Sequence, residues 1–176
     1  MASPWTATHS PCTASCAGWT TSGRTTTTEP AGRWISKSGP APTHSAAPSW
    51  CYGTPGIVRA QQLAAMALGD DERKLMSERA LMYCLADSRQ LDQLAGRGLC
   101  HGLGGLIRTV QRVSDDAENA QPFDDWLRHG SERFLAAPAP QRPDFLEGAA
   151  GATLAFRSAE PGAVTATDWD ACLLLI

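Results

Sequence analysis

Apolar residues recur at helical spacing through much of the chain. The clearest stripe follows the i, i+3, i+4, i+7 pattern of an amphipathic helix and comprises Leu103, Leu106, Ile107, Val110 and Val113. A second stripe follows Pro122, a residue suited to a first helical turn, and comprises Phe123, Trp126, Leu127 and Phe134. Because each stripe lies on one helix face, we predict an inner helix followed by an outer one.

Three further segments carry helical patterns. Residues 57–68 are apolar on nearly every side, which predicts a helix enclosed by others, and residues 72–86 mix charged and apolar positions, which predicts an outer helix. Between them, Gly69-Asp70-Asp71 ends the first helix and offers an N-cap for the second. Residues 145–156 give another inner helix, and the chain closes on an apolar stretch, 172–176. We therefore predict an all-α fold of alternating inner and outer helices.

The inner helices open on a common motif, Gly-x-x-Gly. Its first glycines are Gly53, Gly102 and Gly148, which are separated by 49 and then 46 residues. A period of that size is typical of helix-pair repeats. Cys51 and Cys100 hold the same position in successive repeats. A curved array of such repeats therefore brings Cys51 toward Cys100 and its neighbour His101.

The first 50 residues differ from the rest. They contain ten threonines and four tryptophans but no leucine, valine or phenylalanine, so they have little to bury. We expect an irregular or disordered segment over residues 1–48 and the helical domain over 49–176. Without a helix to present them, the metal-ligating residue types of this segment are interpreted as incidental; they are Cys12, Cys16, His9 and His44.

Composition limits the partners and the compartment. The 176 residues carry a net charge of −3, which gives no electrostatic reason to expect a nucleic acid. No stretch approaches the roughly 18 apolar residues that cross a bilayer, and the first residues do not resemble a signal peptide. We expect a cytoplasmic protein without a membrane span. Its six cysteines are then expected to be reduced thiols, some of them ligands.

The adjacent pair Cys100-His101, set among glycines at the mouth of a predicted helix, is the sharpest chemical signal. With Cys51 it would supply two thiolates and one imidazole, the ligand count of a zinc site with an open fourth position. The third repeat offers no fourth ligand, because Leu146 and Glu147 stand there. A substrate thiol bound at the open position would lose its proton near neutral pH. The alternative is that the cysteines are core residues and His101 a buried histidine.

Other side chains carry smaller expectations. Glu147 either supports the site or stabilises the N-terminus of its helix. Arg108 and Arg112 are expected on solvated faces or paired with acidic residues. Trp50 and Tyr52 either line the rim of a peptide-binding site or pack in the core. Cys84 and Cys172 are expected in the core.

Three motifs in register resemble the lanthionine synthetase C family, the cyclases of lantibiotic biosynthesis. They are Trp50-Cys51-Tyr52-Gly53-Thr54-Pro55-Gly56, Leu99-Cys100-His101-Gly102 and Leu146-Glu147-Gly148-Ala149-Ala150-Gly151, and the ending Trp169-Asp170-Ala171-Cys172-Leu173-Leu174-Leu175 is similar too. The resemblance covers about residues 39–176. It implies part of an α/α toroid whose zinc ion is held by Cys51, Cys100 and His101.

The resemblance also implies an activity. A cysteine thiolate of a dehydrated precursor peptide would add to a dehydrated serine or threonine and form a thioether (lanthionine) ring. A dehydratase of the same pathway is a further partner in that reading. The family's acid/base histidine and aspartate lie in earlier repeats, and His9 and His44 match no such motif, so no catalytic acid is assigned.

We accordingly expect the C-terminal part of a cyclase, truncated, whose upstream part is either lost or read out of frame in residues 1–38. Two functions stay open: a zinc-dependent cyclase, and a non-catalytic zinc-binding repeat remnant. A glycosidase on an α/α toroid would need paired carboxylates at the axis, where the helix openings offer Glu147 alone. An arc of about three helix pairs leaves two apolar edges exposed, which predicts a marginal, aggregation-prone or partner-dependent domain.

Overall fold

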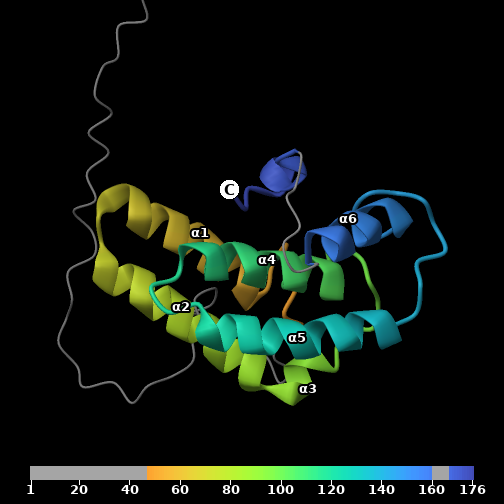
Figure 1. Cartoon of the computed structure of the whole chain (residues 1–176), viewed down its shortest axis with the longest axis horizontal. Coiled ribbons are helices and arrows are strands. Elements are labelled where there is room, and N and C mark those ends of the chain that lie inside the picture. The colour runs from red at the N-terminus through yellow and green to blue at the C-terminus, as the bar shows by residue number, and fades with distance from the viewer. Residues whose placement is uncertain (1–46, 160–166) are drawn as a thin grey trace, which may run out of the picture.

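The computed structural model describes residues 47–159 and 167–176, and these ranges contain helices and no strand (Figure 1). The elements are α1 (Thr54–Leu68), α2 (Asp71–Ala86), α3 (Ser88–Leu91), α4 (Leu103–Asp116), α5 (Gln121–Ala136), α6 (Ala149–Ala159) and a 3-10 helix, η2 (Trp169–Leu173). The all-α prediction is confirmed. Residues 1–46, with Cys12, Cys16, His9 and His44, lie outside the described ranges.

The helices form two layers. Helices α1, α4 and α6 make an inner layer, and α2 and α5 make an outer layer beneath it in the view of Figure 1. Helix α1 pairs with α2 and α4 pairs with α5, while α4 packs between α1 and α6. The predicted alternation of inner and outer helices is therefore present. No helix of the described ranges is long and apolar enough to cross a membrane.

The turn between α1 and α2 follows the sequence signals. Gly69 ends α1 with φ 65°, in the left-handed region that glycine adopts at low cost, and its amide donates to the last carbonyls of the helix. Asp70 then caps α2, because its carboxylate accepts a 3.0 Å hydrogen bond from the amide of Arg73. These two caps fix a tight hairpin between the first inner and outer helices.

The Gly-x-x-Gly motif forms the same close backbone contact three times. Gly56 lies against the carbonyl of Trp50, Gly105 against that of Leu99, and Gly151 against that of Phe145. Each contact joins a glycine to the residue six positions earlier, and a β-carbon at any of the three glycines would overlap that carbonyl oxygen. The chain thus enters each inner helix through a loop of similar shape, so the sequence repeat is also a structural repeat.

The predicted stripe of α4 forms the centre of the main core. All five residues of that stripe are at most 2% exposed. Phe123 and Phe134 of α5 are buried against them, and Trp126 and Leu127 pack at the edge of the same cluster. The buried faces of α4 and α5 therefore agree with the expectation from periodicity.

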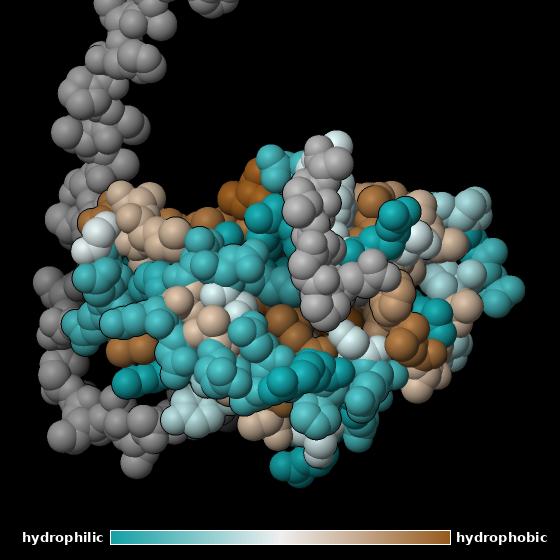
Figure 2. Space-filling model, in the orientation of Figure 1, coloured by the Kyte–Doolittle hydropathy of each residue, from teal (hydrophilic) through white to brown (hydrophobic). Residues whose placement is uncertain are grey.

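Helix α1 is covered on one flank and open on the other. Thr109, Val110 and Val113 of α4 are fully buried, whereas their repeat equivalents on α1, Ala60, Gln61 and Ala64, are exposed. The prediction that residues 57–68 are enclosed is wrong on this flank, because no described helix packs there. Large apolar side chains of α1 and α2 are exposed, among them Met66, Leu68, Met76 and Tyr83. Figure 2 shows hydrophobic surface at the end of the molecule where these two helices lie.

Residues 167–176, the C-terminal segment, pack on the inner helices and form a second, smaller core. Leu173 and Leu175 are buried there together with Leu99 and Ala155, against the partly buried rings of Trp50, Phe145 and Trp169. The expectation that Cys172 lies in the core is wrong: Leu173 and Leu175 face inward, so the side chains at 172, 174 and 176 are exposed. Cys84 is buried, as expected.

Arginines of the inner helices hold the C-terminal segment. Nε of Arg108 and Nε of Arg112 each donate a 2.7 Å hydrogen bond to the same carboxylate oxygen of Asp170, which is fully buried. Nε of Arg59 donates to the carbonyl of Leu175 at 2.7 Å. Of the two expectations for Arg108 and Arg112, pairing with an acidic residue is therefore correct.

We predict that Gly105→Ala lowers the free energy of unfolding by at least about 2 kcal/mol, because the new methyl group overlaps the carbonyl of Leu99. Urea denaturation followed by circular dichroism measures the change. Gly96→Ala is the matched control, since a β-carbon there meets no atom within 4 Å. Equal stability of the two variants would contradict the role assigned to the repeated contact.

A second prediction concerns acid stability. Burial by itself raises the pKa of Asp170, but the hydrogen bonds and charges of Arg112 and Arg108 outweigh it and hold the pKa at about 2. An unfolded aspartate titrates near about 3.9, so the ionised carboxylate stabilises the fold fully above about pH 4 and progressively less toward pH 2.

The stability advantage of the wild type over Asp170→Asn should therefore shrink as the pH falls through this window. Urea midpoints of both proteins at pH 5, 4, 3 and 2 measure it. A constant difference across the series would show that the Asp170 carboxylate has no depressed pKa in the folded chain.

Candidate metal centre

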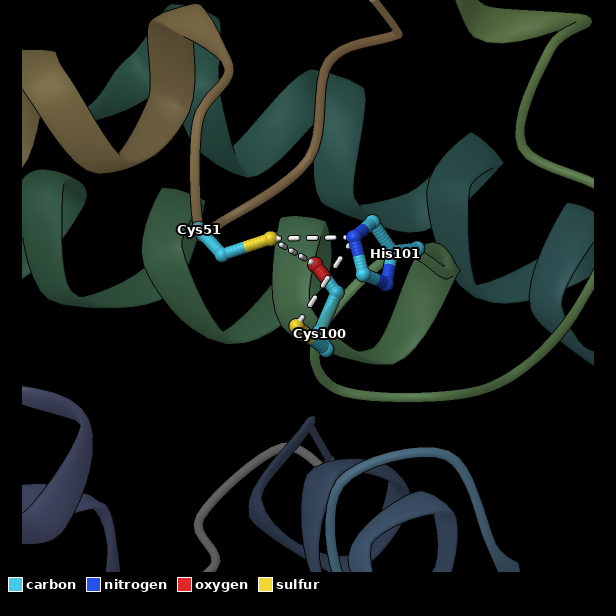
Figure 3. A group of neighbouring side chains, drawn as sticks. All are labelled: Cys51, Cys100 and His101. Atoms are coloured by element: carbon cyan, nitrogen blue, oxygen red, sulfur yellow. Dashed lines mark hydrogen bonds between the residues drawn. The ribbon is translucent and has the colours of Figure 1, made fainter.

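The structure brings Cys51, Cys100 and His101 together from two different repeats. The Sγ atom of Cys51 lies 3.2 Å from Nε2 of His101, and the Sγ atom of Cys100 lies 4.0 Å from the same nitrogen. All three donor atoms lie within 4.8 Å of one another. Figure 3 shows the two sulfurs and the imidazole nitrogen turned toward a common point, at the loops that lead into α1 and α4.

The loop before α4 allows two neighbouring residues to contribute to one site. In a helix, adjacent side chains point about 100° apart, but Cys100 and His101 precede the first residue of α4, Leu103. The amides of Leu99 and Cys100 both donate to the carbonyl of Leu146, at 2.6 and 3.0 Å. This loop is therefore fastened to the third repeat while it presents its thiol and imidazole to the first.

Glu147 fixes the orientation of the histidine. Its Oε1 atom lies 2.7 Å from Nδ1 of His101. A carboxylate there accepts a hydrogen bond from Nδ1–H, so the lone pair of a neutral ring is on Nε2, which faces the two sulfurs. Helix α6 begins later, at Ala149, so of the two readings of Glu147 the structure favours support of the site. The signal in the sequence is its position, which is equivalent to that of His101.

The two aromatic residues beside Cys51 have different surroundings. Tyr52, the third member of this repeat position with His101 and Glu147, is 68% exposed, and its ring centroid lies 5.4 Å from that of His101. The neighbouring Cys51 charge and hydrogen bond raise the pKa of Tyr52. Trp50 instead turns inward and packs in the second core. Tyr52 thus belongs to the rim and Trp50 to the support beneath it.

The electrostatic surroundings of Cys100 disfavour an isolated thiolate. Burial, followed by the hydrogen bond and charge of Cys51 and the charge of Glu147, raises the pKa of its thiol to about 12. The thiols of Cys51 and Cys100 and the carboxylate of Glu147 lie close together, and a nearby positive charge would stabilise the ionised form of each. A bound divalent cation would supply that charge and favour the thiolate form.

The spacing of the three donors suits a small tetrahedral cation. Ordinary Zn–S and Zn–N bond lengths place neighbouring tetrahedral ligand atoms about 3.6–3.8 Å apart. The observed sulfur-to-nitrogen distances of 3.2 and 4.0 Å lie on either side of this value. The side chain of His101 is 50% exposed, so the site opens to solvent on one side. Three donors and an open side fit a metal that keeps one position for a further ligand.

The fold and the site define a class: a protein of helix-pair repeats with a candidate Cys-Cys-His metal centre where two repeats meet. Comparison with known families agrees with this class and narrows it. Residues 21–160 match the family described as lanthionine synthetase C-like protein, and the chain belongs to this family. The match begins before the residue 39 expected from the motifs, and it ends before the C-terminal segment.

The chain is also similar to a curated relative. The chain is 28% identical over 131 residues to the nisin biosynthesis protein NisC of Lactococcus lactis subsp. lactis, an alignment that covers 72% of this chain and 30% of NisC. The chain therefore spans less than a third of the length of that relative. No solved structure gives a significant match.

We predict that Glu147→Ala weakens Zn²⁺ binding about 10–100-fold, the usual effect of removing a carboxylate that orients a ligand histidine. Competition with a chromophoric chelator at neutral pH measures the affinity. Glu132→Ala is the control, because Glu132 is an exposed glutamate of α5. Equal affinities for the two variants would mean that His101 needs no orienting partner.

Proposed function

We propose that this chain holds Zn²⁺ through Cys51, Cys100 and His101 and acts in the formation of thioether rings in a dehydrated precursor peptide. The observation that carries the proposal is the convergence of two thiols and one imidazole from successive repeats, in a member of the lanthionine synthetase C-like family. NisC is named as a nisin biosynthesis protein, and this supports a peptide as the class of substrate.

The donor set favours zinc among the common metal ions. Thiolate and imidazole ligands suit Zn²⁺, whereas Mg²⁺ and Ca²⁺ require oxygen ligands. When bound, zinc lowers the pKa of a coordinated thiol and so supplies a thiolate near neutral pH. Three protein donors leave one position for a cysteine of the peptide.

The residues around the three donors would prepare the site for that cysteine. Glu147 holds the imidazole of His101 so that Nε2 faces the sulfurs. Exposed Tyr52 lies beside His101 and offers an aromatic surface to an approaching peptide. Leu146, whose carbonyl accepts from the amide of Cys100, is also exposed and apolar. Ring closure forms a bond from sulfur to the β-carbon of the dehydrated residue, and the proton lost from the thiol is replaced by one added at the α-carbon.

We also infer the setting of this reaction. A dehydratase must act first, because the acceptor carbon becomes electrophilic only after serine or threonine loses water. The four cysteines of the described ranges are free thiols, which suits a reducing compartment such as the cytoplasm.

A second candidate is a zinc-binding repeat protein without turnover. One observation favours it: within residues 47–159 and 167–176, the titratable side chains found in contact with the three donors are Glu147 and Tyr52, and Glu147 is already bonded to His101. Protonation at the α-carbon needs an acid, and neither side chain is assigned that role. Both candidates require the same metal centre.

Turnover separates the two. A synthetic peptide with one cysteine and one dehydroalanine is incubated with the zinc-loaded protein, and the remaining thiol is alkylated and quantified by mass spectrometry. If the protein is a cyclase, the amount of alkylated peptide should fall with time. Cys100→Ala should slow this fall at least about tenfold. Cys84→Ala, which alters a buried cysteine that is not one of the three donors, is the control.

Two other results are informative. Stoichiometric zinc without thiol loss would support the non-catalytic candidate. Substoichiometric zinc that is unchanged by Cys100→Ala would leave Cys51 and Cys100 without a role in metal binding and end both candidates.

A further inference from the structure

The C-terminal segment, residues 167–176, contacts all three repeats at the residues that precede the site. Trp50, Leu99 and Phe145 occupy equivalent positions, each six residues before the second glycine of its motif. Their side chains gather in one cluster around Leu173 and Leu175 of the C-terminal segment. This segment therefore packs where the three inner-helix loops converge.

Two of these residues are directly bonded to the cysteines of the site. Trp50 precedes Cys51 and Leu99 precedes Cys100, so only one peptide unit separates each cysteine from the second core. The indole Nε1 of Trp50 donates a 3.0 Å hydrogen bond to the carbonyl of Leu173, and Leu99 is fully buried against the same segment. A shift of either residue would displace a sulfur atom by a comparable distance.

The C-terminal segment is anchored to both repeats that supply the donors. Arg59 of α1 and Arg108 of α4 are repeat equivalents, each buried, and each donates from Nε to this segment. Arg59 donates a hydrogen bond to the carbonyl of Leu175, and Arg108 donates one to the carboxylate of Asp170. One short segment thus links the repeat that carries Cys51 to the repeat that carries Cys100 and His101.

We propose that the C-terminal segment is a positioning element of the metal centre: by docking beneath Trp50 and Leu99 and bridging α1 and α4, it sets the separation of Cys51 from Cys100 and His101. The inference rests on the proposed zinc site. It adds that the affinity of this site for zinc depends on the C-terminal segment of the same chain. A site held by its supports binds its ion more tightly than one that must be ordered on binding.

The test uses the full chain and a change of a few atoms. Trp50→Phe keeps an aromatic ring and removes the hydrogen bond to Leu173. We expect Zn²⁺ affinity to fall about 10–100-fold, as for other supporting groups of metal sites. In the Co²⁺-substituted protein, the visible absorption bands that report tetrahedral thiolate coordination should shift or weaken. Trp126→Phe, at the edge of the main core, is the matched control.

A second pair of variants separates positioning from general loss of stability. Leu173→Ala removes a leucine of the second core, and Leu81→Ala removes one of the main core; both side chains are buried. The two variants are expected to have similar urea midpoints. The inference predicts that Leu173→Ala nevertheless alters zinc affinity and the Co²⁺ spectrum much more than Leu81→Ala does.

Three outcomes would overturn the inference. If Trp50→Phe and Leu173→Ala bind zinc as the wild type does, the C-terminal segment does not position the site. If all four variants weaken binding alike, the effect is one of stability only. If the wild type itself binds no zinc, the proposed function fails and the inference fails with it, a result distinct from the first two.

Discussion

The contact of a glycine with the carbonyl six residues earlier determines how the chain enters each inner helix. It occurs at Gly56, Gly105 and Gly151, and in each case it leaves no room for a side chain. Because the contact shapes the loop before each inner helix, it also sets the direction in which the preceding residues point. Cys51, Cys100 and Leu146 therefore occupy corresponding places around the array. The convergence of the three donors at the candidate metal centre therefore follows from backbone packing that three repeats share.

The candidate site is composite, and no single repeat could form it. One sulfur comes from the first repeat, a sulfur and the imidazole come from the second, and the carboxylate that orients the imidazole comes from the third. The carbonyl of Leu146 also fastens the second loop to the third repeat. Chemistry of this kind depends on how the repeats are stacked. A change in the relative angle of the repeats would therefore change the distances between the donor atoms.

Local features of the fold were predictable, and features that depend on neighbours were not. The stripe of α4, the glycine stop of α1 and the Asp70 cap follow from periodicity and backbone chemistry, and repeat alignment brought Cys51 toward Cys100. The open flank of α1 did not follow, because an apolar pattern does not reveal which helices are present to cover it. The link from Glu147 to His101 and the pairing of Arg108 with Asp170 join residues 46 and 62 positions apart. Sequence position suggested support of the site by Glu147 and an acidic partner for Arg108, and the three-dimensional arrangement identifies His101 and Asp170 as the partners.

Arg59 and Arg108 show how a repeated residue can serve two different acceptors. Arg59 bonds a backbone carbonyl, an acceptor that residue 175 offers whatever its side chain, while Arg108 bonds a carboxylate that only the side chain at 170 supplies. The tolerance of the two positions to change is therefore unequal. Residue 175 is free to vary among apolar side chains that fill the second core, whereas at residue 170 the charge itself must be kept. Substitutions in the last ten residues should thus be tolerated according to the kind of acceptor each one provides.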